Sequence, residues 1–436
     1  MSFRNIADKL TTRDEPMASR RNLTISNYAA GTAANLIGGS FLTGLLLLLK
    51  ADNSILGIVA MTGIIGNLFQ IFAPLFLERF IHRKRMLIIS RIIAYVFNIF
   101  IIGIIPFLPA ENGTKLVFIL IVISGVSLLN SLMGPGVSIW HIKSIPEDIR
   151  RGYYSFYQMT SAIIVYVCIM GASLLLDSMK RAGYELGGLT LIRGIALLLG
   201  FIDLLFVIRV KEYPNPVSHI KLNLKSIFIL PLKEKKYMPS VIAAVVWSFT
   251  ANFTGMYFSA YMLKQVQVEY SFLNFVNLLG IPVLILTTPF WNKFIAKHSW
   301  FKSLIFTMIV FLFHHLSIAF VTKQTLWIYP ISLVIYFAVV PGLNIIFSSI
   351  PYLNIPETNQ TNYIAFYTTV STVAALIGIS AGRLFMLNTE GVSLNILGMQ
   401  MVNNQYLLIL NAGVTLLMTG IILIMHINMK RQKISD

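Results

Sequence analysis

The chain has 436 residues, of which 56% are hydrophobic and only 12% charged, and its mean hydropathy is +0.75. Soluble domains carry about one quarter charged residues, so this composition excludes an ordinary water-soluble protein. The formal net charge of +17 invites a nucleic-acid partner. The placement of the basic residues, described below, argues against one.

Long apolar runs follow one another along the chain. A run of about 20 apolar residues crosses the bilayer core as a helix, and helices are expected because backbone polar groups must be satisfied within lipid. We predict an all-α integral membrane protein with twelve spans. They run over Ile25–Leu49, Ile55–Leu77, Met86–Leu108, Leu116–Ile139, Tyr154–Leu176, Leu189–Ile208, Val241–Leu263, Phe272–Trp291, Phe301–Val321, Leu326–Ile350, Tyr363–Leu384 and Tyr406–Met425.

Neither a signal peptide nor a cysteine cluster is expected. The first twenty residues are polar and carry no apolar stretch, which argues against a cleavable signal. The single cysteine, Cys168, lies inside a predicted span. A disulfide or a cysteine metal cluster within the chain is therefore not expected.

The basic residues divide unequally between the two sides of the predicted spans. Of the 34 Lys and Arg, 25 fall on the side of the two termini, six on the opposite side and three within spans. Such an excess places both termini in the cytoplasm. The positive charge is therefore a topology signal, and no nucleic-acid partner is expected.

Two internal repeats divide the chain. IPEDIRRGYYSFYQMTS at 145–161 returns as IPETNQTNYIAFYTTVS at 355–371, 210 residues later. At an offset of 214, Ala29, Ala30, Leu49, Lys50, Gly66, Phe80 and Ile81 match Ala243, Ala244, Leu263, Lys264, Gly280, Phe294 and Ile295. Six spans are therefore repeated as six spans.

The repeat gives the domain plan. We predict a cytoplasmic tail over 1–21, a six-helix bundle over 22–209, a cytoplasmic linker over 210–238, a second six-helix bundle over 239–428 and a tail over 429–436. An even number of spans per half makes the two bundles parallel. Such halves suit a carrier that rocks about a central cavity.

The repeated phrase allows two interpretations. It marks the entry to the fifth span of each half, where a gating role is one possibility. The other is helix capping, because Ser144 with Glu147, and Asn354 with Glu357, have capping-box spacing.

With this 6+6 plan and long central linker, the chain resembles the major facilitator superfamily over essentially its whole length. The loop after the second span reads PLFLERFIHRKR at 74–85 and is similar to that family's acid-arginine loop, although both family glycines are replaced. The resemblance implies that Glu78, Arg79 and Arg83 brace the cytoplasmic side during gating. The alternative is that the basic run is only a topology anchor.

Two glycine-proline sequences are further gating candidates. Gly134, Pro135 and Gly136 fall late in the fourth span, and Pro341 and Gly342 fall late in the tenth, its counterpart. Helices interrupted at corresponding places in two halves point to the moving or binding parts of a transporter. The alternative is close helix packing.

Charges within spans are functional candidates by default. Arg91 and Asp203 have matching depths in spans three and six, which the resemblance makes neighbours, so we predict a structural ion pair. Arg193 and Arg383 lie near the external ends of their spans and are expected to extend to water.

The resemblance implies a substrate cavity lined by spans one, four, seven and ten. Their candidate substrate-binding residues at mid-depth are Asn35, Asn130, Trp247, Asn252, Tyr257, Tyr336 and Asn344. No Asp, Glu, Lys or Arg occurs at mid-depth in these four spans. Amides and aromatic rings suit a neutral polyol such as a sugar, or a lipophilic molecule held by stacking.

The predicted function is a secondary active or facilitative transporter of a small organic solute, acting by alternating access. Multidrug or lipophilic-compound efflux is the alternative. A membrane enzyme is not expected, because the loops supply only scattered acids. Neither catalytic residues nor a metal site is predicted, and the adjacent His314 and His315 point to different helix faces.

Several further expectations complete this prediction. No cofactor is expected, and coupling to H+ or Na+ is possible. The partners are the solute and membrane lipid, with no nucleic acid, and the chain is expected to be a monomer in the plasma membrane.

Overall fold

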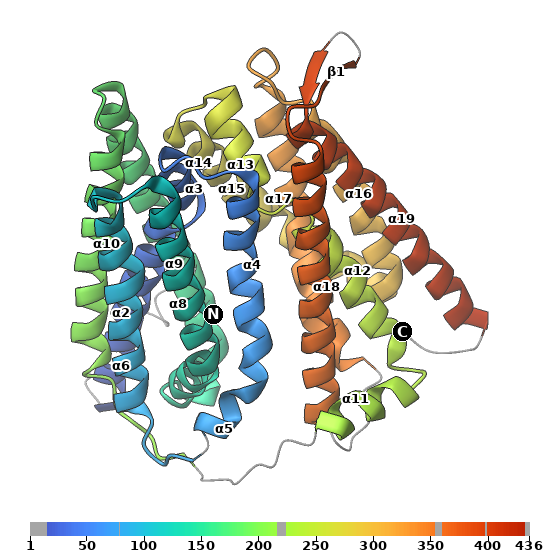
Figure 1. Cartoon of the computed structure of the whole chain (residues 1–436). Coiled ribbons are helices and arrows are strands. Elements are labelled where there is room, and N and C mark those ends of the chain that lie inside the picture. Colours follow the sequence, from blue (N-terminus) through green and yellow to red (C-terminus); the bar gives the residue numbers. More distant parts are fainter. Residues whose placement is uncertain (1–14, 78, 216–223, 354–359, 397–398, 432–436) are drawn as a thin grey trace. The chain divides into compact units, whose positions relative to one another are not determined.

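The computed structural model describes residues 15–77, 79–215, 224–353, 360–396 and 399–431. These residues form helices joined by short loops, with one small β-hairpin (Figure 1). Within them, twelve helical stretches are long and apolar enough to cross a membrane. The prediction of twelve spans is confirmed.

Spans one to six begin in α2 and end in α10. The elements are α2 (Glu15–Ile37), α3 (Gly39–Leu48), α4 (Asn53–Phe69), η1 (Gln70–Phe72), α5 (Ala73–Leu77), α6 (Lys84–Tyr95), η2 (Val96–Ile101), α7 (Ile102–Ile104), η3 (Ile105–Phe107), α8 (Asn112–Lys143), α9 (Glu147–Arg181) and α10 (Glu185–Val207). Several spans are thus built from more than one helix, while α8, α9 and α10 are each continuous.

Spans seven to twelve follow a short linker helix. The elements are α11 (Leu224–Lys233) in the linker, then α12 (Met238–Asn252), α13 (Tyr257–Tyr261), η4 (Met262–Val266), α14 (Tyr270–Leu278), α15 (Gly280–Lys297), α16 (Trp300–Ala319), α17 (Ile328–Ser349), η5 (Ile350–Tyr352), α18 (Gln360–Asn388), β1 (Ser393–Ile396), β2 (Met399–Val402) and α19 (Asn403–Arg431). The antiparallel β1–β2 hairpin lies between the last two spans, where the sequence predicted no strand.

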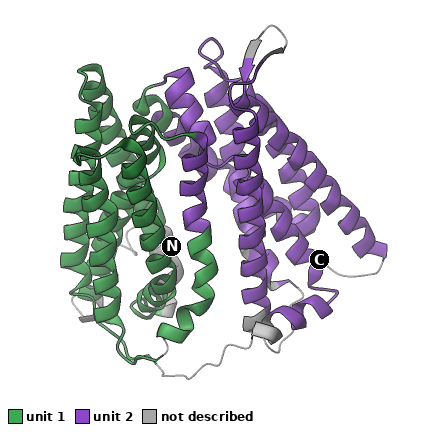
Figure 2. Ribbon diagram, viewed as in Figure 1, with its two compact units in different colours: residues 1–52, 65–222, 269–274 green, residues 53–64, 223–268, 275–436 purple. Residues whose placement is uncertain are grey.

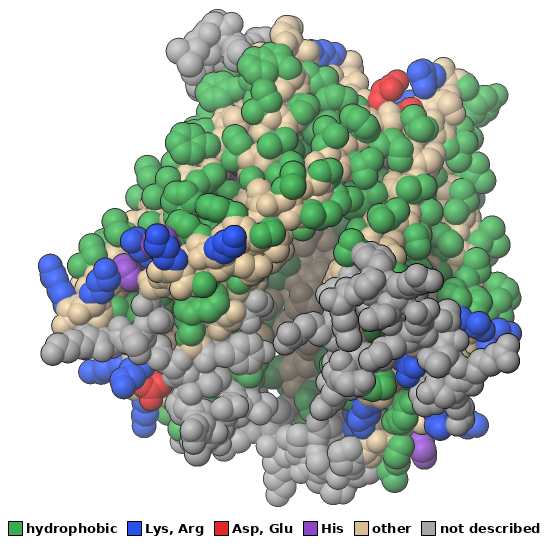
Figure 3. Space-filling view, turned by 180° about the vertical axis from the view of Figure 1, so that it is seen from behind, with side chains coloured by type: hydrophobic (Ala, Val, Ile, Leu, Met, Phe, Trp, Pro, Cys, Tyr) green, Lys and Arg blue, Asp and Glu red, His purple; other side chains and the backbone are tan. Residues whose placement is uncertain are grey.

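Twelve crossings return the chain to the side from which it started. We call the side of the two chain ends the terminal side and the other the far side. Hydrophobic side chains cover most of the face seen in Figure 3, and Lys and Arg side chains gather mainly towards its lower edge. This is the surface expected of a protein surrounded by lipid.

The chain forms two compact units, coloured separately in Figure 2. Unit 1 contains residues 1–52, 65–222 and 269–274, and unit 2 contains residues 53–64, 223–268 and 275–436. The units depart from a division into two six-span bundles at two short segments. The start of span two belongs to unit 2, and the start of span eight belongs to unit 1.

The repeated tyrosine of the 145–161 phrase joins span five to span one in unit 1. The hydroxyl group of Tyr153 lies 2.8 Å from Oγ1 of Thr24 on α2. In unit 2 the equivalent Tyr363 packs edge-on against Tyr237, with ring centroids 5.1 Å apart. The Tyr237 hydroxyl also donates to the Tyr363 carbonyl at 3.1 Å. Packing of the fifth span on the first therefore accounts for part of the repeated phrase.

The predicted capping box at 144–147 is wrong. Helix α9 begins at Glu147 behind Pro146, which has no capping side chain. Ser144 instead ends α8, where its hydroxyl donates to the Trp140 carbonyl at 2.9 Å. The second predicted box, at Asn354 and Glu357, lies outside the described residues.

The predicted interruptions in spans four and ten are also absent, because α8 and α17 run unbroken through Pro135 and Pro341. Two of the glycines allow close packing: a Cβ on Gly342 would lie 2.5 Å from the Trp291 ring and one on Gly136 would lie 3.0 Å from Leu77, whereas one on Gly134 would have nothing within 4 Å. A gating role for these residues stays a prediction. Nε1 of Trp291 donates at 2.6 Å to the carbonyl of Ala338, three residues before Pro341. A partner is thus supplied close to where proline removes a helical hydrogen bond.

Candidate functional site

Span one is interrupted between α2 and α3. Gly38 is extended, with φ −110° and ψ −163°, and Gly39 has φ +50°. Because only glycine adopts such a left-handed conformation without strain, the Gly38–Gly39 pair explains the interruption. Asn35 lies one turn before it, exposed, and donates to the Gly31 carbonyl at 2.8 Å.

Span seven is interrupted between α12 and α13, where Gly255 has φ +49°. The last carbonyl groups of α12 lie against a glycine face of α18. A Cβ on Gly378 would approach the Phe249 carbonyl oxygen to 2.4 Å, and one on Gly382 would approach that of Phe253 to 1.9 Å. Two bare glycines therefore let α18 approach the backbone beside the interruption.

The two interruptions occupy equivalent positions in the repeat. At the offset of 214, Gly38 corresponds to Asn252, the last residue of α12. Discontinuous helices in corresponding places of two halves are the usual sign of a transporter's binding region, because unwound backbone can then contact a substrate. The paired interruption predicted for spans four and ten is therefore found in spans one and seven.

Three of the predicted cavity amides are exposed on their units: Asn35, Asn130 and Asn344. Among the described residues, the side-chain amides of Asn130 and Asn344 have no hydrogen-bond partner. An unpaired amide facing hydrocarbon is costly. Faces that carry such amides inside a span therefore favour contact with water or a polar solute.

The other predicted cavity residues are more enclosed. Trp247 is half-buried and stacks on Phe347, with centroids 5.4 Å apart and planes at 20°. Tyr336 is half-buried beside His314, at 5.1 Å. Asn252 is half-buried too and donates to the Ser248 carbonyl at 2.8 Å.

Tyr257 does not fit the predicted open position. It is 1% exposed, and its hydroxyl donates to the Asn53 carbonyl at 3.2 Å inside unit 2. The reason is that the start of span two, residues 53–64, belongs to unit 2 and packs against this ring.

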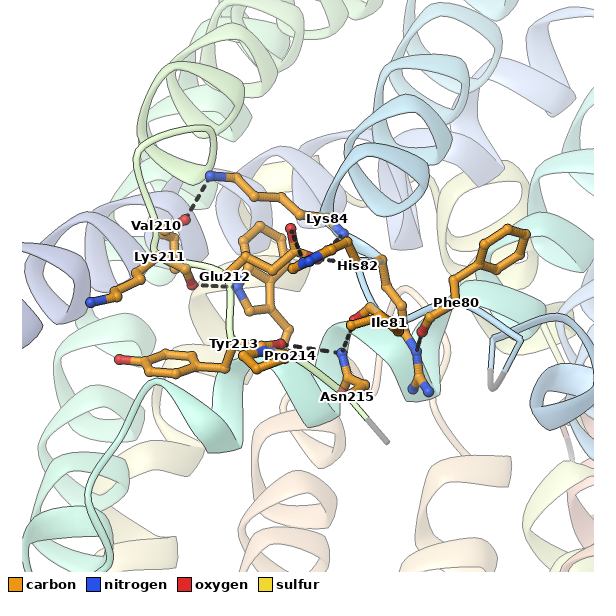
Figure 4. A network of polar contacts seen from close by, with 12 residues as sticks. Phe80, Ile81, His82, Lys84, Val210, Lys211, Glu212, Tyr213, Pro214 and Asn215 are labelled. Atoms are coloured by element: carbon orange, nitrogen blue, oxygen red, sulfur yellow. Dashed lines mark hydrogen bonds and ion pairs between the residues drawn. The ribbon is translucent and has the colours of Figure 1, made fainter. Parts of the chain in front are cut away.

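A polar network ties the loop after span two to the segment after span six (Figure 4). Oε1 of Glu212 accepts the backbone N–H groups of Arg83 at 2.5 Å and Lys84 at 2.8 Å. These groups lie at the start of α6, where N–H groups lack helical partners and a negative charge is favourable. Glu212 therefore caps span three, a role that sequence reasoning missed.

The predicted gating charges lie beside this network. Arg83 is 5% exposed, and its Nε donates to the Phe80 carbonyl at 3.1 Å, which stabilises its own loop. Arg79 is exposed. Glu78 lies outside the described residues. Bracing by these residues during gating stays a prediction.

The structure brings together the predicted ion pair. Nη1 of Arg91 lies 2.8 Å from Oδ1 of Asp203, whose side chain is completely buried. Tyr95 donates to Oδ2 of the same carboxylate at 2.6 Å, and Ser26 donates to Oδ1. Asp203 thus joins spans one, three and six inside unit 1, away from the interruption of span one.

Of the two arginines expected to extend to water, Arg193 is buried and Arg383 is half-buried. Arg193 is 5% exposed and donates to the Asn98 carbonyl at 2.9 Å. Nε of Arg383 donates to the Ser54 carbonyl at 3.3 Å, and Nη2 donates to the Ser54 hydroxyl. Each finds acceptors inside its unit, which sequence alone could not place.

The twelve spans, the six-span repeat and the paired interruptions are features of a membrane transporter fold. The chain matches the Major Facilitator Superfamily over residues 23–379, and it belongs to that superfamily. No curated protein sequence matches the chain significantly.

Solved transporter structures share the fold at low sequence identity. A mutant of the nucleoside transporter NupG is 14% identical with a TM-score of 0.70, covering 93% of this chain and 99% of its own. A bacterial homologue of the iron transporter ferroportin is 12% identical with a TM-score of 0.67, covering 97% of this chain and 99% of its own. A D-xylose-proton symporter is 13% identical with a TM-score of 0.66, covering 93% of this chain and 96% of its own. These likenesses show the fold and leave the substrate open.

Proposed function

We propose that this chain is a secondary active or facilitative carrier that moves a small neutral organic solute across the plasma membrane by alternating access. The observation that carries the proposal is the equivalent interruption of spans one and seven, in which Asn35 lies one turn before the break and Asn252 at it. Unwound backbone beside an amide offers donors and acceptors to a polar solute.

The uncharged character of the central spans supports a neutral solute. The mid-depth parts of spans one, four, seven and ten contain no Asp, Glu, Lys or Arg. A charged solute would normally need a counter-charge there. Amide groups with aromatic rings suit a sugar-like molecule, and the transporters of similar fold include one for D-xylose and one for nucleosides.

The distribution of basic residues supports the orientation. With 25 of 34 Lys and Arg on the terminal side and six on the far side, both termini are assigned to the cytoplasm. The far side then faces outwards.

Efflux of a lipophilic compound is the second candidate function. It is supported by the stacked Trp247 and Phe347 side chains, which are half-buried. A flat apolar cation could stack on such rings without any hydrogen bond.

Thermal unfolding of the purified protein separates the two candidates. The protein is heated in detergent with monosaccharides, disaccharides, nucleosides or lipophilic cations, because a ligand of the folded state stabilises it by about 2.7 kcal/mol at 100 times its Kd. Stabilisation by a neutral solute supports the proposal. Stabilisation by lipophilic cations alone would replace it with efflux.

Variants then locate the site. Asn35→Ala and Asn344→Ala are expected to remove stabilisation by the solute. Asn388→Ala is the matched control, because Asn388 is also exposed and also donates to a carbonyl four residues earlier, that of Leu384 at 2.8 Å. Equal loss of stabilisation in all three variants would contradict the assignment.

A further inference from the structure

The first turn of α14 is held by side chains of unit 1. Residues 269–274 belong to this unit although the rest of span eight belongs to unit 2. Asp177, on the last turns of α9, is 2% exposed. Its Oδ1 accepts the Tyr270 N–H at 2.9 Å, and its Oδ2 accepts the Ser271 N–H at 2.7 Å.

These two bonds suit a carboxylate. Tyr270 and Ser271 are the first residues of α14, so their N–H groups have no partner within the helix. Bonds from such groups to an ionised acceptor are stronger than neutral ones, and the helix dipole favours the negative charge. Asp177 therefore holds the start of span eight by its backbone.

Side chains complete the attachment. The Tyr270 ring is 1% exposed and stacks on Phe41 at 6.1 Å, and its hydroxyl donates to Oε1 of Glu185 at 3.0 Å. One turn later, Nδ2 of Asn274 donates to Oγ of Ser173 at 2.8 Å. We call Asp177, Ser173 and Glu185, with the turn 270–274 that they hold, the first latch.

The fit leaves no spare room under the tyrosine. Gly44 on α3 lies below Tyr270, where a Cβ would meet the hydroxyl oxygen at 1.9 Å. Any side chain at position 44 would thus push the ring out of its place.

Unit 2 holds the start of span two in the equivalent way. Residues 53–64 correspond to 267–278 at the offset of 214, and Arg383 corresponds to Ser173 at the offset of 210. Arg383 donates to Ser54, and Tyr257 donates to the Asn53 carbonyl. We call Arg383 and Tyr257, with Asn53 and Ser54, the second latch.

We propose that the first latch fastens the start of span eight to unit 1, and that Asp177 must release the first turn of α14 in each cycle of alternating access. This rests on the proposed alternating-access function, because only such a cycle requires the start of span eight to leave unit 1. The free energy of the two hydrogen bonds to Asp177 then has to be supplied each time that the latch is released.

Thiol labelling tests the latch in the full-length protein. Cys168→Ser removes the natural cysteine, and Leu273→Cys places a reporter at a position that is 5% exposed in the turn that the first latch holds. The protein is reconstituted in nanodiscs and treated with a membrane-impermeant maleimide. Adding Asp177→Asn is expected to raise the labelling rate about tenfold, because bonds to a charged acceptor are the strong ones.

The control removes a carboxylate from the same region. Glu269 is exposed and lies 3.7 Å from Arg181, so Glu269→Gln changes the same charge without touching the latch bonds. Its labelling rate is expected to stay within about twofold of the parent. Equal rates for Asp177→Asn, Glu269→Gln and the parent would overturn the proposal.

A second variant protects the test against misfolding. Gly44→Ala displaces Tyr270 without changing a charge and is also expected to raise labelling. If Asp177→Asn does not fold, unchanged labelling of Gly44→Ala overturns the proposal. Labelling needs no transported solute, so a failure of the solute panel would reject the proposed function without deciding this result.

Discussion

The two latches hold the starts of equivalent spans with opposite charges, from positions one helical turn apart, because Arg383 corresponds to Ser173 and not to Asp177. In unit 1 the carboxylate of Asp177 accepts backbone N–H groups at the start of α14. In unit 2 the guanidinium of Arg383 donates to the carbonyl and hydroxyl groups of Ser54 at the start of α4. A negative charge complements a helix N-terminus and a positive charge does not, so we expect the first latch to be the stronger.

The interiors of the two units also differ in the charge of their polar groups. Unit 1 contains the buried Arg91–Asp203 ion pair. Unit 2 contains a polar contact without a carboxylate, in which Nδ1 of His314 lies 2.8 Å from Oγ of Ser332. The polar groups in the interiors of the two units therefore differ in their chemistry.

The largest expected effect tests this difference in the interiors. Asp203→Ala leaves Arg91 without its counter-charge, and we expect the free energy of unfolding to fall by about 3–5 kcal/mol. His314→Ala removes an interaction that involves no carboxylate and should cost about 1–3 kcal/mol. Thermal unfolding in detergent measures both.

A double variant checks the cause. Arg91→Leu with Asp203→Leu should recover part of the loss, because no unpaired charge remains. Equal destabilisation by the single and double variants would mean that shape, and not charge, decides this site.

The next effect tests how tightly each latch fits. Gly44→Ala should lower the free energy of unfolding by about 1–3 kcal/mol, because a Cβ would lie 1.9 Å from the end of the buried Tyr270 ring. Gly57→Ala should cost less, because its nearest atom, the Tyr257 hydroxyl oxygen, would lie 2.4 Å from the Cβ and the next two belong to the flexible Arg383 side chain. The melting temperatures of the two variants give the order.

Gly413→Ala is the control for both, since a Cβ at that position has nothing within 4 Å. Alanine is the better helix former, so this change should be neutral or slightly stabilising. A cost for Gly413→Ala as large as that for Gly44→Ala would remove the argument from close fit.

The smallest effect compares the latches directly. Leu56 is 1% exposed at the start of span two, within the segment 53–64 that belongs to unit 2. Labelling of Leu56→Cys in the Cys168→Ser background therefore reports on the second latch. We expect Arg383→Gln to raise its labelling by no more than about threefold, because the lost bonds are partly exposed. An increase larger than that caused by Asp177→Asn at the first latch would reverse the proposed order of strength.

The amino-acid sequence predicted the spans and the repeat well, because apolar runs and matched residues are local signals. The Arg91–Asp203 pair followed from the matched depths of two charges in neighbouring spans. The positions of Asp177 and Arg383 did not follow, because each binds a segment from the other half of the sequence.

The interruptions show a different limit of sequence reasoning. Proline suggested breaks in spans four and ten, yet α8 and α17 continue through Pro135 and Pro341. The Gly38–Gly39 pair carried the signal for span one, and Gly255 that for span seven. In an apolar span such glycines look the same as packing glycines, and only the backbone angles tell them apart.

The shared position of the two interruptions has a consequence for the origin of the chain. A break present at the same place in both copies was inherited from a six-span ancestor, which would have worked as a pair of identical chains. In such a pair every acid or base occurs twice, so both copies must carry the same charge at a given position. Ser173 in one copy and Arg383 at the matching position of the other therefore became possible only after the duplication.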